Sequence, residues 1–150
     1  KPDNGGMLWE LVYNSIAYPA APSDDALAHL VDAARARNRQ LGITGVLLHH
    51  NGEYVQLLEG EREVVETLFR ARIARDPRHR GVTVCWEQAI AVRGFEDWSM
   101  GLCCGSALAE IAGVEDAESA SCLQSLDFSG PGSEGRKVLL SIYAAIRAGA

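Results

Sequence analysis

The stretch Tyr54-Val55-Gln56-Leu57-Leu58 places a neutral amide in the middle of an otherwise apolar segment. Successive side chains of a strand point to opposite faces, and apolar residues here occupy both sets, so both faces of the sheet should be covered. A buried amide needs hydrogen-bond partners, because an unpaired one costs on the order of 1–3 kcal/mol. An amide can also exchange its donor and acceptor ends by rotating. Gln56 is therefore a candidate switch.

The segments around this strand carry clear start and stop signals. Ser23 is predicted to be the N-cap of a helix that reaches about Asn38. The tripeptide His50-Asn51-Gly52 predicts a tight hairpin, because Asn-Gly accepts the positive φ angles of a type I′ turn. A second helix is expected over residues 62–75, and Asp76-Pro77 ends it. Apolar patterns predict strands over residues 8–13, 42–49, 53–59, 82–91 and 98–104.

The order strand–helix–strand–strand–helix–strand–strand predicts an α+β fold, a ferredoxin-like sheet with both helices on one face. In this fold the first strand lies beside the third, so Tyr13 and Gln56 can be neighbours. We expect a non-native remnant over residues 1–6, one domain over 7–105 and a C-terminal helical cap over 106–150. The last helix should cover the second sheet face with an apolar stripe. That stripe consists of Leu139, Ile142, Tyr143 and Ile146.

Composition limits the function classes. The chain has 150 residues and a net charge of −6, which fits one domain and argues against general binding to nucleic acid or to anionic membranes. No apolar run approaches the ~18 residues of a membrane span, and no export signal is visible, so we expect a cytosolic protein. Arginines gather between residues 62 and 80. The acidic Glu61, Glu63, Glu66 and Asp76 are interleaved with them, which favours a solvated helix with ion pairs over a nucleic-acid surface.

The four cysteines show no metal-binding spacing. They stand at positions 85, 103, 104 and 122 without a C-x-x-C pair, and His49-His50 lacks the spacing of a structural zinc site. We expect buried, reduced thiols on strands.

Several motifs occur together in the order that the predicted fold requires, and with them the chain resembles BLUF domains, which sense blue light with FAD. The similarity covers residues 8–104, and from it we expect a short, stand-alone member of that family. The stretches that carry it are Leu11-Val12-Tyr13-Asn14-Ser15, residues 38–47, Val55-Gln56-Leu57-Leu58-Glu59-Gly60, Asp76-Pro77-Arg78-His79 and Phe95-Glu96-Asp97-Trp98-Ser99-Met100.

The resemblance implies a flavin ring between the two helices, edge-on to the sheet. Asn38 would hydrogen-bond the pyrimidine edge of the ring, and Leu47 and Ile73 would flank it. Asp76, Arg78 and His79 would lie near the ribityl-phosphate end. Arg39 stands where some family members carry a second Asn, so it is a further candidate for the flavin edge. The cofactor implied is FAD, for which FMN or riboflavin can substitute.

The resemblance also implies a light-driven mechanism and no enzymatic activity. Tyr13 would give an electron and a proton, by way of Gln56, to the excited flavin. After back transfer, Gln56 would be rotated or tautomerised and would donate a new hydrogen bond to the flavin, which shifts the absorption to the red. Trp98 and Met100 would then relay the change to an unidentified protein partner. Self-association into a homo-oligomer is also expected.

Two other function classes stay open from the residues alone. A small ferredoxin-like hydrolase of the acylphosphatase type would use an Arg and an Asn near a loop to bind a phosphate and orient water. The absence of a glycine-rich phosphate loop after the first strand weighs against it. The other is a flavin-free interaction module in which Gln56 is only structural.

Overall fold

The computed structural model describes residues 6–95, 101–103 and 134–148. Its centre is a five-stranded sheet in the order β4-β1-β3-β2-β5, in which β2 and β5 are parallel and the other pairs antiparallel. The elements are β1 Leu8–Ala17, α1 Asp24–Leu41, β2 Thr44–His50, β3 Glu53–Glu61, α2 Arg62–Leu68, the π-helical turn η1 Phe69–Ile73, β4 His79–Ala89, β5 Gly101–Cys103 and α5 Glu134–Ala148.

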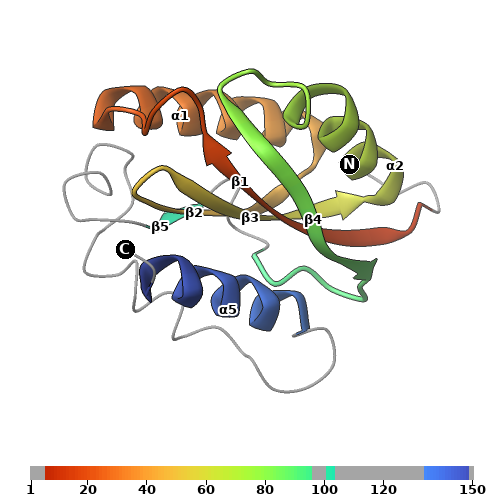
Figure 1. The fold of residues 1–150 in the computed structure, drawn as a ribbon. Coiled ribbons are helices and arrows are strands. Elements are labelled where there is room, and N and C mark those ends of the chain that lie inside the picture. The colour runs from red at the N-terminus through yellow and green to blue at the C-terminus, as the bar shows by residue number, and fades with distance from the viewer. Residues whose placement is uncertain (1–5, 96–100, 104–133, 149–150) are drawn as a thin grey trace.

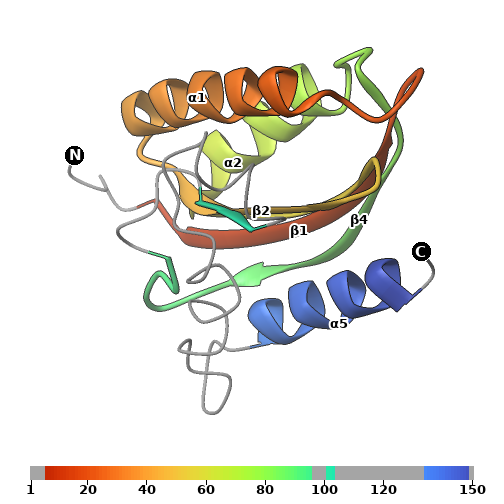
Figure 2. The ribbon, with the colours of Figure 1, turned by 90° about the vertical axis from the view of Figure 1, so that its left-hand side faces the viewer.

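The sheet separates two layers of helices (Figures 1 and 2). Helices α1 and α2 cover one face, and α5 lies across the other. Each face has its own apolar core: Leu11, Leu47 and Leu58 point toward α1 and α2. Val12, Val46 and Leu57 point toward α5. This confirms the predicted ferredoxin-like α+β fold with a C-terminal helix on the second face.

The local signals in the sequence act as predicted. The Ser23 hydroxyl accepts a hydrogen bond from the backbone N–H of Ala26 at 3.1 Å, which caps α1. Gly42 ends the helix at a φ of 71°, in the left-handed region that glycine adopts readily. Asn51 and Gly52 have φ angles of 50° and 84°, as the hairpin between β2 and β3 requires.

Some element boundaries differ from the prediction. β1 continues to Ala17, and the second helix is α-helical only to Leu68 before it widens into η1. The wider turn brings Leu68 and Ile73, five positions apart, into the same core. The strand predicted over residues 98–104 is described only at Gly101–Cys103.

The prediction of buried cysteines is wrong for Cys85, which is exposed. Cys85 lies on β4, and β4 is an edge strand of the sheet whose side chains are mostly exposed. The sequence pattern of β4 does not reveal that position in the sheet. Cys104 and Cys122 lie outside the described residues.

The register between β1 and β3 sets up the functional site. It pairs Tyr13 directly with Gln56, and both side chains point to the face that α1 covers. The same register pairs Glu10 with Glu59 on the opposite face. Within the part of the chain that the structure describes, no helix has the length and apolarity to cross a membrane.

Candidate functional site

Tyr13 and Gln56 form a buried hydrogen-bonded pair at the centre of the sheet. They lie on adjacent strands, and their side chains are 5% and 4% exposed. The phenol O–H of Tyr13 donates a short hydrogen bond to the amide oxygen Oε1 of Gln56. Burial raises the pKa of Tyr13 well above its usual range, so the phenol keeps its proton at neutral pH.

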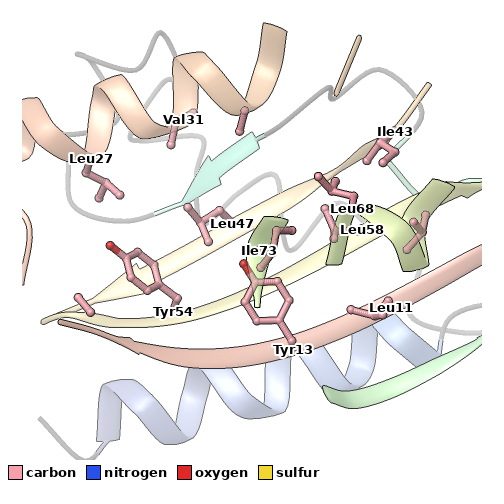
Figure 3. Close-up of a cluster of buried hydrophobic side chains, with 13 residues drawn as sticks. Leu11, Tyr13, Leu27, Val31, Ile43, Leu47, Tyr54, Leu58, Leu68 and Ile73 are labelled. Atoms are coloured by element: carbon pink, nitrogen blue, oxygen red, sulfur yellow. The ribbon is translucent and has the colours of Figure 1, made fainter. Parts of the chain in front are cut away.

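This pair opens onto a cavity of about 180 Å³ between the sheet, α1 and η1. A buried water needs only about 10–15 Å³ by such a measure, so the cavity has room for a much larger group. Tyr13, Leu47, Tyr54 and Gln56 form its floor on the sheet, as Figure 3 shows for the first three. The side from α1 contains the small residues Ala33 and Ala34 beside Leu30.

The π-helical turn and the start of β4 complete the cavity beside Tyr13. Ile73 lines it from η1, and the ring of Phe69 packs against the ring of Tyr13 with centroids 5.4 Å apart. His79 is held at both ring nitrogens: Nε2 lies 2.6 Å from the carbonyl oxygen of Ile73, and Nδ1 lies 2.8 Å from the hydroxyl of Ser15. Because a carbonyl only accepts, Nε2 carries a proton and the His79 ring is fixed edge-on to Tyr13.

The rim of the cavity carries excess positive charge. Arg37, Arg72 and Arg78 line it, and Asp76 is the only carboxylate among its lining residues in the described chain. Arg78 already pairs with Asp76 at 2.5 Å, and its hydrogen bonds lower the pKa of Asp76 to about 2. Burial, with Arg72 adding to it, lowers the pKa of Arg37. Two cationic side chains are thus left to attract an anion in a chain whose net charge is −6.

The structure gathers most of the predicted site residues around this cavity. Those that line it are Tyr13, Leu47, Gln56, Ile73, Asp76, Arg78 and His79. Asn38 is fully buried next to Arg37, whose Nε donates to Asn38 Oδ1 at 3.2 Å, but it does not line the cavity. Arg39 is exposed in the last turn of α1 and is not brought to the cavity. Trp98 and Met100 lie outside the described residues.

Sequence reasoning missed three polar lining residues. Tyr54 stands two positions before Gln56, so strand alternation places it on the same face, and that signal was available. The position of Arg37 could have been predicted from that of Ala34, because residues three apart lie on the same face of a helix. Arg72 was assigned to a solvated helix surface, and its place at the rim depends on the phase of the π-helical turn. The ion pairs predicted for that surface do form between Glu66 and both Arg62 and Arg70.

The arrangement suits a flat aromatic ligand with an anionic tail. Small and apolar side chains face each other across the cavity, an oxidisable phenol and a rotatable amide stand at its floor, and cations stand at its rim. A flavin nucleotide has this combination of a planar ring and a phosphate. The residues present therefore fit a flavin.

Comparisons with known proteins agree with this reading. A family model described as "Sensors of blue-light using FAD" matches residues 8–101. The beta subunit of the photoactivated adenylate cyclase of Euglena gracilis is 40% identical over 75 residues, which are 49% of this chain and 9% of that subunit. This chain spans about a tenth of the length of such curated relatives.

Solved structures extend the similarity to the whole fold. The dark state of BlrB, a BLUF protein, is 33% identical with a TM-score of 0.64, over 93% of this chain and 98% of BlrB. BlrP1 of Klebsiella pneumoniae, solved with FMN and cyclic diGMP, is 39% identical with a TM-score of 0.60, over 70% of this chain and 29% of BlrP1.

Proposed function

The chain belongs to the BLUF family, the sensors of blue light using FAD, and from this premise we propose that Tyr13 and Gln56 are its photoactive pair. Members of this family use flavin to sense blue light, and the matched region is a sensor module that is not itself an enzyme. The observation that carries the proposal is the direct hydrogen bond from Tyr13 to Gln56 on the floor of the cavity.

The two side chains have complementary chemistry. When bound, the flavin supplies the absorption of blue light and an electron acceptor. Tyr13 is an oxidisable phenol that holds its proton in the dark, and oxidation makes that proton labile. Gln56 already accepts the phenol O–H, so its amide oxygen is the group that meets this proton first. A rotated or tautomerised amide then presents a donor where it had presented an acceptor, which is the change that the light state retains.

The rim of the cavity supports a phosphorylated flavin. Arg37 and Arg72 suit a phosphate group, which guanidinium groups bind through paired hydrogen bonds. Leu47 and Ile73 would flank the ring, and Asn38 would hold its polar edge through an amide that can both donate and accept. Asp76, Arg78 and His79 would lie toward the ribityl chain. We propose FAD, with FMN able to replace it, and chromatography of the flavin released by denaturation identifies the species.

An absorption spectrum before and after blue illumination tests the photoactive pair. We expect a small red shift that reverses in the dark in the wild-type protein and in Tyr54→Phe. The shift should be absent in Tyr13→Phe and in Gln56→Leu. Tyr54→Phe is the matched control, because it removes a phenol hydroxyl from the same cavity and leaves the Tyr13–Gln56 bond in place. Persistence of the shift in Tyr13→Phe would contradict the proposal.

A purified protein that is colourless and cannot be reconstituted with FAD would contradict flavin binding itself. Hydrolysis of an acyl phosphate by that colourless protein would then support the hydrolase alternative. A flavin that bleaches under light without shifting would indicate a different photochemistry.

The signal is proposed to reach a partner protein through the sheet and α5, with Trp98 and Met100 as relay residues. The identity of the partner, a homo-oligomeric state and a cytosolic location stay predictions from the sequence. Size-exclusion chromatography in the dark and under light tests self-association.

A further inference from the structure

The second polar centre of the molecule is the carboxylate of Glu59, on the face of the sheet opposite the cavity. Its side chain is 1% exposed, and it accepts three hydrogen bonds. The backbone N–H of Gly94 donates to Oε2 at 2.6 Å, and the backbone N–H of Phe95 donates to Oε1 at 3.0 Å. The hydroxyl of Thr44 donates to the same Oε1 at 2.8 Å. A strand residue thus fixes the backbone of a turn 35 positions later in the chain.

Arg93 fastens the same turn from its other side. Its guanidinium donates to the hydroxyl of Thr44 at 2.9 Å, to the carbonyl oxygen of Glu59 at 3.1 Å and to the carbonyl oxygen of Gly42 at 2.7 Å. Gly42 is the C-cap of α1. Residues 93–95 are therefore tied to β2, to β3 and to the end of α1 by hydrogen bonds that the half-buried guanidinium of Arg93 donates.

The first turn of α5 packs on this fastened turn at Gly94 and on β1 at Glu10, each time through a close glycine contact. The guanidinium of Arg136 lies directly against Gly94, where a Cβ atom would collide with it. Gly135 approaches the carboxyl group of Glu10 so closely that a Cβ atom would lie 2.5 Å from its carboxyl carbon. Phe95 belongs to the apolar core that contains Leu139 and Ile146 of α5.

We propose that Glu59, together with Arg93, is a positioning group that couples the photoactive strand β3 to α5. It holds the turn 93–95 on the strand, and α5 packs on that turn, so that strand, turn and helix move as one body. This inference rests on the proposed function of Tyr13 and Gln56 and adds the route by which their change leaves the cavity.

The position of Glu59 on β3 makes this route short. It lies three residues after Gln56, on the opposite face, with no break in the strand between them. Glu10 on β1 is the register partner of Glu59. It connects β1 to β4 on the same face of the sheet, because Trp86 Nε1 and Gln88 Nε2 on β4 each donate to its Oε2 at 3.0 Å. A displacement of β3 at Gln56 thus reaches the turn 93–95, on which α5 packs, without crossing the flavin cavity.

Hydrogen–deuterium exchange of the flavin-loaded full chain, in the dark and under blue light, tests the coupling. In the wild-type protein, light should change the exchange of the amides in α5. In Glu59→Gln the amide NH₂ meets the N–H of Gly94, a donor facing a donor, while the amide oxygen still accepts from Phe95 and Thr44. We expect Glu59→Gln to keep the red shift in the flavin spectrum and to lose the light-induced change in α5.

Two further variants sharpen the result. Gly135→Ala leaves β3 and the cavity intact but places its Cβ atom against Glu10, so it should also keep the red shift and reduce the response of α5. Thr44→Val removes the hydroxyl that joins Glu59 to Arg93, and it serves if Glu59→Gln does not fold. Glu53→Gln is the matched control: it removes a carboxylate from the exposed start of the same strand and should respond as the wild type does.

The outcomes separate the two proposals. A wild-type protein without a red shift contradicts the proposed photoactive pair. A wild-type protein with a red shift and no change in α5 overturns the coupling alone. So does a Glu59→Gln protein, or where it does not fold a Thr44→Val protein, in which α5 responds to light as in the wild type. Loss of the α5 response with the red shift retained supports Glu59 as the coupling group.

Discussion

The face of the sheet toward α1 buries an uncharged polar pair, Tyr13 and Gln56, whereas the face toward α5 buries two carboxyl groups, Glu10 and Glu59. The two pairs lie on the same strands, three residues apart, and each pair is held in direct register. The Tyr13–Gln56 pair borders a cavity, and the carboxyl pair is packed under a helix and a turn.

As a result, the amide of Gln56 can rearrange, whereas the carboxyl group of Glu59 is held in place. Rotating the amide of Gln56 exchanges a donor for an acceptor, and no net charge has to move. Rearranging Glu59 would leave the buried N–H of Phe95 and the partly buried N–H of Gly94 without an acceptor, and a buried unpaired donor costs about 1–3 kcal/mol. The molecule thus places its switch on one face of β3 and a rigid anchor on the other.

The largest loss of stability is expected when the hydrogen bonds between Glu59 and the turn 93–95 are removed. Glu59→Leu removes three hydrogen bonds and leaves the buried N–H of Phe95 and the partly buried N–H of Gly94 without an acceptor, so the free energy of unfolding should fall by about 3–5 kcal/mol. Urea unfolding followed by circular dichroism measures it. The exposed Glu53→Leu on the same strand is the control, with an expected change within about 0.5 kcal/mol. Equal effects of the two substitutions would contradict the anchoring role.

A charge placed beside Tyr13, on the uncharged face of the sheet, should cause the next largest loss in the free energy of unfolding. In Gln56→Glu the new carboxyl group is buried beside the phenol of Tyr13, and burial raises the pKa of a carboxyl group. The variant should therefore be close to the wild type in acid and lose stability as the pH rises, by about 3 kcal/mol once the group is ionised. Urea unfolding at several pH values measures this loss, with Gln56→Leu as the uncharged control. A loss that does not depend on pH would show that Gln56 is not in a site that excludes charge.

The uncharged site could be predicted from the sequence because local signals place it. Gln56 stands out in an apolar strand, and the order of elements sets β1 beside β3, which brings Tyr13 to it. The hairpin at Asn51-Gly52 fixes the register of β2 against β3. These signals act within a few residues or through the alternation of strands, so a single sequence contains them.

The anchor could not be predicted, because its partners are distant in the chain and its donors are backbone groups. The residues around Gly94 give no indication that its backbone N–H donates to Glu59. Glu10 likewise has no distinguishing feature in the sequence, and only the register between β1 and β3 pairs it with Glu59. The π-helical turn was missed for a related reason. Its residues have ordinary helical propensity, and packing of Leu68 and Ile73 in one core decides its width.

The smallest expected effect is on the pH dependence of the free energy of unfolding, to which two carboxyl groups contribute with opposite signs. Burial raises the pKa of Glu10 above 4.5, Glu59 adds to the rise, and Trp86, Gln88 and Arg136 oppose it. A raised pKa means that the folded state holds the proton longer than the unfolded state. The contribution of Glu10 to stability is thus fully present below 4.5 and is lost as the pH rises through its folded pKa.

Asp76, at the cavity rim, behaves in the opposite way. Its hydrogen bonds to Arg78 lower its pKa from 3.8 to about 2, so its contribution is present above 3.8 and is lost as the pH falls toward 2. Because the Arg78 side chain of this pair is 67% exposed, Asp76→Asn should cost less than about 1 kcal/mol at neutral pH. Urea unfolding across both windows should show the acid-side slope flattened in Asp76→Asn and the slope above 4.5 flattened in Glu10→Gln. If Glu10→Gln changed the acid-side slope instead, Glu10 would be ionised in the folded state.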